Sequence, residues 1–272
     1  MKVIIGVVKC SIMGSFFGKP EYGTPQGAYS KEHLIFVGIL LLCMTILAIV
    51  IGLKNRKKSE NIKNKVLIWA AILINGFELF KIAFNLGCSD DGMSWTRDLP
   101  LFLCSIQLIA IPLAAFSKGN LHEASKDFVF IFGILGAVLG TVGAAQNYNA
   151  YPVLSFPNVV SGITHSISGF CSLYIGISGM SSMKKSNKKI VFSILFGFCL
   201  AAYIANIILD YNYMFLMNHD GTPYSIIYNL ENGNKILYPI SVVVLFVLYI
   251  QIFSTIYNFF KKNIINNKNK LK

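Results

Sequence analysis

Long apolar stretches alternate along the chain with short connections that carry most of its charges. Each stretch holds roughly 18–25 residues, and a helix rises about 1.5 Å per residue, so each is long enough to cross a bilayer core of roughly 30 Å. The pattern therefore predicts an all-α, polytopic membrane helix bundle with seven transmembrane helices. The predicted spans are 33–53, 66–86, 99–116, 127–145, 158–180, 190–209 and 236–260.

The segments that flank the spans differ from them in composition. In residues 1–32, Lys9 interrupts the first apolar run and a Gly/Pro-rich stretch follows, which predicts an interfacial segment rather than a signal peptide. Residues 261–272 are rich in Lys and Asn, which predicts a basic, disordered tail. Between them, residues 33–260 form one seven-helix transmembrane domain.

The distribution of Lys and Arg predicts the orientation of the bundle. The connections after the first, third and fifth spans and the C-terminal tail are rich in Lys, whereas the opposite connections contain only Arg97 and Lys235. Basic residues are enriched in cytoplasmic loops. We therefore predict that the N-terminus lies outside and the C-terminus in the cytoplasm, and that the protein is a multi-pass protein of the cell membrane.

Composition supports a membrane location and excludes several classes of function. Hydrophobic residues make up 54% of the chain and charged residues only 13%, about half the usual share for a soluble domain. The net charge of +12 follows from the cytoplasmic loops, so membrane lipids rather than nucleic acid are the expected partners. The six cysteines contain no CxxC pair, and P-loop, GxGxxG and HExxH motifs are absent. We therefore expect no metal, nucleotide or other cofactor.

Five polar or reactive side chains interrupt the apolar spans, namely Glu78, Lys81, Cys104, Gln107 and His165. Ionisable groups at such depths are costly and usually functional, because a protein interior or a water-filled cavity must receive them. The helical rise places all five in the outer half of the membrane, Glu78 and Gln107 about 12 Å below the outer ends of their spans. We therefore expect a polar cavity open to the outer leaflet above an apolar cytoplasmic half.

Three further residues belong to this candidate site. Asn206 and Asp210 close the outer end of the sixth span, and Tyr213 follows in the longest connection of the chain. Together with Glu78, Lys81 and Gln107 they are the expected substrate-binding residues.

Each of the intramembrane residues also has a purely structural interpretation. Glu78 and Lys81, three residues apart on a helix, are spaced to pair with each other. A single intramembrane histidine such as His165 is often a hydrogen-bond partner between helices. Cys104 has the size and polarity of an ordinary core residue. These interpretations stay open beside the functional ones.

Local patterns predict how two of the helices begin and pack. Asp98, followed by Pro100, is a candidate N-cap with a proline in the first turn of the third span. The fourth span contains a GxxxG pair, Gly136 and Gly140, that allows close helix packing. His165 lies one turn from glycines on both sides of it, which predicts a buried imidazole.

Two segments resemble the bacterial YwaF family, which is related to eukaryotic transmembrane protein 164. The run Leu99–Ser105 reads Leu-Pro-Leu-Phe-Leu-Cys-Ser and resembles that family's Leu-Pro-Leu-His-Leu-Cys signature. The run Asn212–Leu216, with Pro223 and a Tyr238–Pro239 pair downstream, resembles its Asn-Tyr-Met-Phe-Leu segment and the return to the last span.

The resemblance implies a site for lipid acyl transfer or hydrolysis, because the eukaryotic relatives are regarded as phospholipid acyltransferases with a Cys and a His in the membrane. His33 and His165 fall where family histidines are expected. Phe102 stands at the position of the motif histidine, and Leu101 at that of the eukaryotic cysteine. Cys104 is one helical turn from Leu101, so a continuous helix would present its thiol to the same cavity.

Three hypotheses follow. In the first, Cys104 attacks a lipid acyl ester after His165 removes its proton; Glu78 or Asp210 orients the imidazole, and Gln107 or Asn206 stabilises the oxyanion.

In the second hypothesis, Glu78, Lys81 and His165 line a pocket that binds or transports a small solute. In the third, the protein is structural or immunity-like, and its polar residues only hold the helices together. Loss of lipid turnover without Cys104 would distinguish the first, solute accumulation that depends on Glu78 the second, and an effect on stability alone the third.

Overall fold

The computed structural model describes residues 24–88, 96 and 98–270, and within these residues the regular structure is entirely helical. The chain divides into two compact units, one ending at Ser181 and one running from Ser182 to Lys272. The predicted interfacial segment at residues 1–32 lies mostly outside the described residues. The all-α prediction is confirmed.

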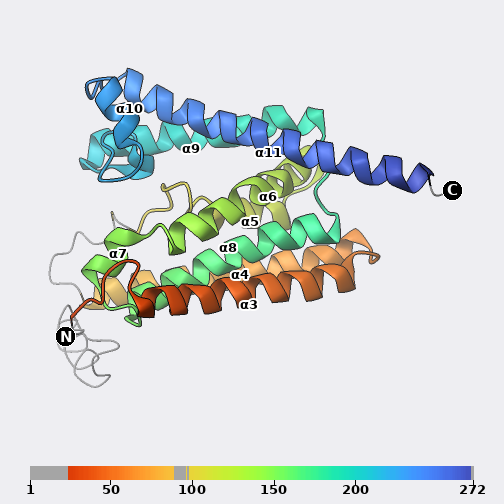
Figure 1. The fold of residues 1–272 in the computed structure, drawn as a ribbon, viewed down its shortest axis with the longest axis horizontal. Coiled ribbons are helices and arrows are strands. Elements are labelled where there is room, and N and C mark those ends of the chain that lie inside the picture. The colour runs from red at the N-terminus through yellow and green to blue at the C-terminus, as the bar shows by residue number, and fades with distance from the viewer. Residues whose placement is uncertain (1–23, 89–95, 97, 271–272) are drawn as a thin grey trace. The chain divides into compact units, whose positions relative to one another are not determined.

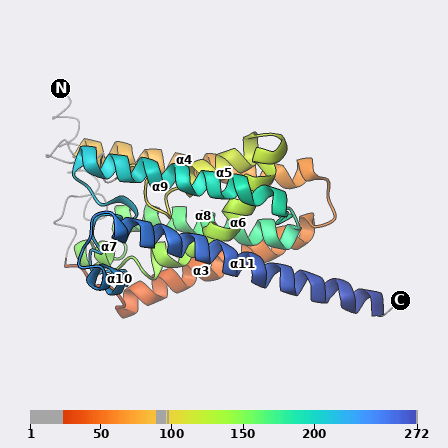
Figure 2. The ribbon, with the colours of Figure 1, turned by 90° about the horizontal axis from the view of Figure 1, so that it is seen from above.

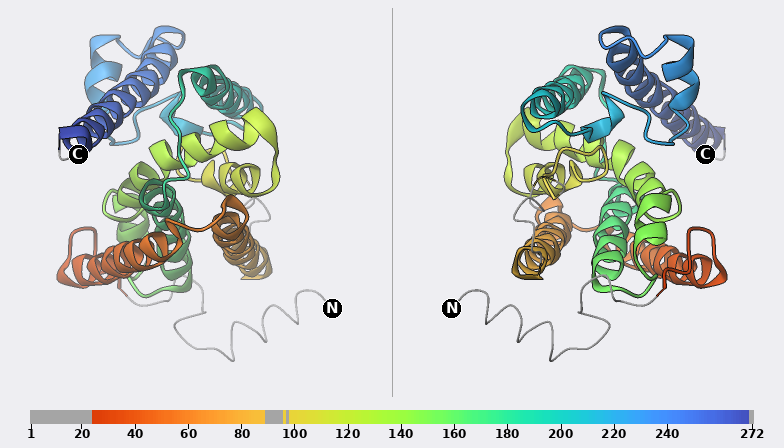
Figure 3. Two further views of the ribbon diagram at one scale, coloured as in Figure 1. Left: turned by 90° about the vertical axis from the view of Figure 1, so that its right-hand side faces the viewer. Right: turned by 90° about the vertical axis from the view of Figure 1, so that its left-hand side faces the viewer.

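The first unit is a bundle around one central helix. Helix α8 (Phe156–Ser178) packs against α3 (Lys31–Asn55), α4 (Glu60–Cys88) and α6 (Gly119–Thr141), as Figures 1 and 3 show. The short helices α5 (Gln107–Phe116) and α7 (Ala145–Ala150) complete it, and α5 packs between α4 and α6.

Glycines allow α6 and α8 to approach closely. A Cβ atom on Gly133 would lie 2.7 Å from the Ser168 carbonyl oxygen, and one on Gly140 would collide with the His165 ring. At the same contact Ser168 Oγ donates to the Gly133 carbonyl at 3.2 Å and Ser172 Oγ to that of Phe130 at 2.6 Å. The predicted role of these glycines in helix packing is confirmed.

The third predicted span differs most from the structure. Its helix begins at Gln107 instead of residue 99, and Asp98 does not cap it. Instead, Ser105 Oγ accepts from the Phe102 N–H at 3.0 Å and donates to the Phe102 carbonyl at 3.1 Å, an alternative to the helical pattern that serine commonly offers. Pro100 also disfavours helical geometry at the residue before it.

Among the described residues, six helices are long and apolar enough to cross a membrane. The second of these spans is Glu60–Asn85, and the third joins α6 and α7 as Gly119–Ala150. Helix α5 has 10 residues, which at about 1.5 Å each cover only half of a bilayer core. The number of seven crossings and the orientation therefore remain predictions.

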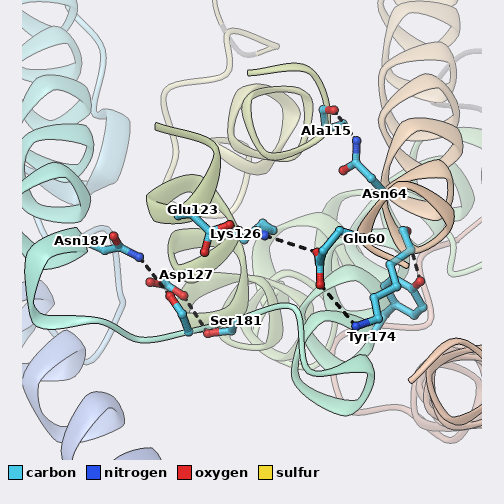
Figure 4. A network of polar contacts seen from close by, with 11 residues as sticks. Glu60, Asn64, Ala115, Glu123, Lys126, Asp127, Tyr174, Ser181 and Asn187 are labelled. Carbon is cyan, nitrogen blue, oxygen red and sulfur yellow. Dashed lines mark hydrogen bonds and ion pairs between the residues drawn. The ribbon is translucent and has the colours of Figure 1, made fainter. Parts of the chain in front are cut away.

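A buried charged network lies at the ends of α4, α6 and α8 that the charge pattern assigns to the cytoplasm (Figure 4). Helix α6 begins at Gly119, earlier than predicted, so Lys126 and Asp127 lie inside it. Lys126 is 2% exposed and pairs with Glu123 at 2.7 Å and with Glu60 at 3.7 Å. This network belongs to the helix ends, and the apolar cytoplasmic half stays a prediction, as does the orientation.

The second unit contains two long helices, α9 (Lys188–Leu209) and α11 (Leu237–Lys270), labelled in Figure 2. A short 3-10 helix, η1 (Lys185–Asn187), precedes α9. The connection between the long helices holds the 3-10 helix η2 (Tyr213–Phe215) and helix α10 (Ser225–Leu230), which packs against α11.

Candidate functional site

An ion cluster joins α4 to the start of the non-helical segment before α5. Lys81 Nζ lies 2.7 Å from a Glu78 carboxylate oxygen and 3.5 Å from one of Asp98. All three side chains are largely buried, and Asn85 Nδ2 donates to Asp98 at 3.1 Å. The predicted pairing of Glu78 with Lys81 is confirmed, and Asp98 is a third member that the sequence suggested only as a helix cap.

A second contact from α4 holds the other end of this segment. Pro112 lies inside α5 and has no N–H, so the carbonyl of Leu108, one turn earlier, lacks its usual donor. Asn75 Nδ2 donates to that carbonyl at 3.1 Å. The polar face of α4 thus fixes both ends of residues 98–108, which explains why an apolar stretch can stay non-helical inside the protein.

Cys104 lies on this fixed segment and packs against α6. A Cβ atom on Gly136 would lie 3.4 Å from Cys104 Cα and 3.6 Å from its Cβ. Cys104 precedes α5, so the expectation that it shares a helix face with Leu101 is wrong. The cysteine is presented by a turn that contacts a glycine instead.

His165, from α8, packs against the next turn of the same α6 face. Its ring occupies the space that a side chain on Gly140 would need. Because Gly136 and Gly140 are one helical turn apart, Cys104 and His165 lie over successive turns of one face. Lys81 is near enough to interact electrostatically with both.

Gln107 is fully buried, with 0% of its surface exposed. Its backbone N–H donates to the Cys104 carbonyl at 3.4 Å, but neither polar atom of its side-chain amide has a partner among the described residues. Buried amides are nearly always hydrogen-bonded. The Gln107 amide is thus a buried polar group that no described residue satisfies.

The remaining predicted site residues, Asn206, Asp210 and Tyr213, belong to the second unit, and their place in the candidate site stays a prediction. The Asn206 amide accepts from the Tyr213 N–H at 2.6 Å and donates to the Tyr213 carbonyl at 3.1 Å. Asp210 ends α9 in a left-handed conformation with φ of 49°. Asn206 therefore fixes the backbone of the connection that follows α9.

His33, at the position expected for a family histidine, makes contacts that stabilise the fold. It is fully buried, and its Nδ1 accepts from the Tyr29 N–H at 2.9 Å while Nε2 lies 3.2 Å from the Thr141 carbonyl. Its ring packs on Tyr148 with the ring centroids 3.9 Å apart. Nε2 thus joins α3 to the end of α6, and Nδ1 fixes the backbone just before α3.

Within the described residues, no group of three or more His, Cys, Asp or Glu side chains is placed to bind a metal. The acidic loop that follows α4 lies outside the described residues, with Asp90, Asp91, Trp95 and Arg97.

A family model described as the TMEM164 family matches residues 28–257. The match covers every candidate residue named above and all the long helices except the last part of α11. No curated protein and no solved structure matches the chain.

Proposed function

The chain belongs to the TMEM164 family of membrane proteins, and we propose that it transfers or hydrolyses an acyl chain of a membrane lipid in the cell membrane, with Cys104 as the nucleophile and His165 as the general base. One observation carries this proposal. Cys104 and His165 come from different elements and pack over successive turns of the same α6 face, against Gly136 and Gly140.

The proposed reaction has two steps. In the first, a ring nitrogen of His165 takes the thiol proton, and Cys104 Sγ attacks the ester carbonyl carbon of the lipid. The C–S bond forms as the C–O bond breaks, and the imidazolium returns the proton to the departing alkoxide, which leaves as a lysolipid. In the second, water or an acceptor hydroxyl gives its proton to His165 and attacks the thioester carbonyl carbon. The new C–O bond forms as the C–S bond breaks, the imidazolium returns the proton to Sγ, and a fatty acid or a new acyl ester leaves.

Two neighbours support these steps. The unpartnered amide of Gln107 is a donor for the oxyanion that forms on the carbonyl oxygen, a role worth about 10²–10³ in rate elsewhere. Lys81, fixed by Glu78 and Asp98, provides a positive charge that favours the thiolate. Glu78 is therefore better placed to orient Lys81 than to orient the imidazole.

The test is lipid turnover in liposomes that contain the purified protein. Cys104→Ala and His165→Ala should each abolish release of labelled fatty acid or its transfer to a lysolipid. Cys171→Ala is the matched control, because Cys171 is a buried cysteine on α8 that is not placed against these glycines. Unchanged turnover in folded Cys104→Ala protein would remove the proposal.

A second candidate function rests on the ion cluster. Two carboxylates share one ammonium group there, which leaves a net negative charge. Such a site suits a small solute. Transport would require uptake that depends on Glu78 and not on Cys104, measured with Glu78→Gln and Cys104→Ala proteoliposomes.

A further inference from the structure

A second set of unpartnered polar atoms lies in the second unit, where the connection between α9 and α11 joins α11. Glu231 follows α10, and its Oε1 accepts from Ser241 Oγ at 2.5 Å. Its Oε2 is buried and has no hydrogen-bond partner among the described residues. The carboxylate is thus held on one side and free on the other.

Tyr238, in the first turn of α11, provides the second atom. Its side chain is 1% exposed, and its hydroxyl has no hydrogen-bond partner within the described part of the chain. Its ring packs edge-on against Tyr228 with the centroids 5.1 Å apart and an interplanar angle of 85°. The carboxylates of Glu231 and Asp220 are close enough to interact electrostatically with its hydroxyl.

This site is built on a fixed backbone. The Asn212 side chain accepts from the Met217 and Asn218 N–H groups at 2.9 and 3.2 Å. It also donates to Asp220 Oδ2 at 2.6 Å. These contacts fix the loop that carries Asp220, so a ligand would meet carboxylates that are already in place.

The free atoms define the chemistry of a ligand. A buried carboxylate oxygen only accepts hydrogen bonds, and the nearby aromatic rings and second carboxylate favour a positive charge. A metal is a poor fit, since the described residues offer no group of three or more carboxylate, imidazole or thiol ligands. We propose that Glu231 Oε2 and the Tyr238 hydroxyl form a binding site for a primary ammonium group, on an aminolipid headgroup or on a free amine.

The test compares a primary ammonium ion with a quaternary ammonium ion, which has no N–H group, and with sodium. Purified full-length protein in phosphatidylcholine nanodiscs is melted in ethylammonium chloride, tetramethylammonium chloride or sodium chloride at equal ionic strength. Saturating ethylammonium should raise Tm by about 2–4 °C over the other two salts. The rise should vanish in Glu231→Gln and Tyr238→Phe and persist in Glu32→Gln, a control at an exposed glutamate.

Tyr238→Phe keeps the test decisive even if Glu231→Gln does not fold, because it removes only a hydroxyl that bonds to no described residue. Nanodiscs that contain phosphatidylethanolamine show whether the ammonium group comes from a lipid headgroup or from a free amine. If they raise Tm and ethylammonium then adds nothing, the ligand is a lipid headgroup; if ethylammonium still adds, it is a free amine. A wild-type protein that responds equally to all three salts, or a Tyr238→Phe protein that responds like wild type, would overturn the proposal.

Discussion

Replacing Lys81 with Met tests whether the ion cluster on α4 is a buried unit. Lys81 pairs with Glu78 at 2.7 Å and with Asp98 at 3.5 Å, and the side chains of the two acids are 11% and 6% exposed. Without Lys81 both carboxylates lose their counter-ion in a largely dehydrated site. Breaking a buried pair in this way costs about 3–5 kcal/mol.

We take the lower end, about 3 kcal/mol, because Asn85 still donates to Asp98 in the variant. For a protein of this length that corresponds to a fall in Tm of about 6–12 °C. Adding Glu78→Gln to Lys81→Met removes one of the stranded charges and should recover roughly half of the loss.

The assay is thermal unfolding in a fixed detergent, with Lys54→Met as control because Lys54 is exposed and forms no ion pair among the described residues. The control should change stability by less than about 0.5 kcal/mol. If Lys81→Met behaves like the control, or if Glu78→Gln gives no recovery, the carboxylates are hydrated and the cluster is not buried as described.

Three further variants test neighbouring contacts. Asn75→Ala should lower stability by about 1–3 kcal/mol, because it strands the carbonyl that Pro112 leaves free; adding Pro112→Ala restores an N–H donor and should reduce that loss in the same melting assay. Gln107→Leu should leave Tm unchanged or higher, since its amide has no partner within the described residues, but should lower lipid turnover by about 10²-fold; equal turnover would exclude it from the site. Gly140→Ala should displace the His165 ring, lowering stability by about 1–3 kcal/mol and turnover with it; an unchanged Tm would contradict the close contact.

Most of the fold could be predicted from the sequence because the membrane leaves the backbone few choices. Helices satisfy their own polar groups, so runs such as 158–180 and 190–209 predicted α8 and α9 to within a few residues. The glycine contacts could also be predicted from the sequence, because GxxxG spacing in an apolar helix is typical of close helix packing. These features depend on local periodicity alone.

The prediction of the third span failed partly because its conformation also depends on partners distant in the chain. Residues 99–116 are as apolar as a helix, but Asn85 and Lys81 hold Asp98 and Asn75 holds Leu108. Nothing within the segment reveals these contacts. The same limit applies to Lys126, whose buried pairing with Glu60 joins residues far apart in the chain.

The prediction of the candidate site met the same limit, because contacts between distant parts of the chain cannot be seen in the sequence. Depth along each helix placed Cys104 and His165 in one layer, but only the α6 face that both contact explains how they would meet. Asn206 bonds to the backbone of Tyr213, and an asparagine that holds a backbone and one that binds a ligand look alike in sequence.

The central claim, that Cys104 is acylated with the help of His165, is tested most directly by mass spectrometry of the protein after exposure to a phospholipid ester. The account predicts an acyl group on Cys104 that hydroxylamine removes, formed at least about 10²-fold more slowly in His165→Ala. An unmodified Cys104, or acylation at the same rate without His165, would contradict it.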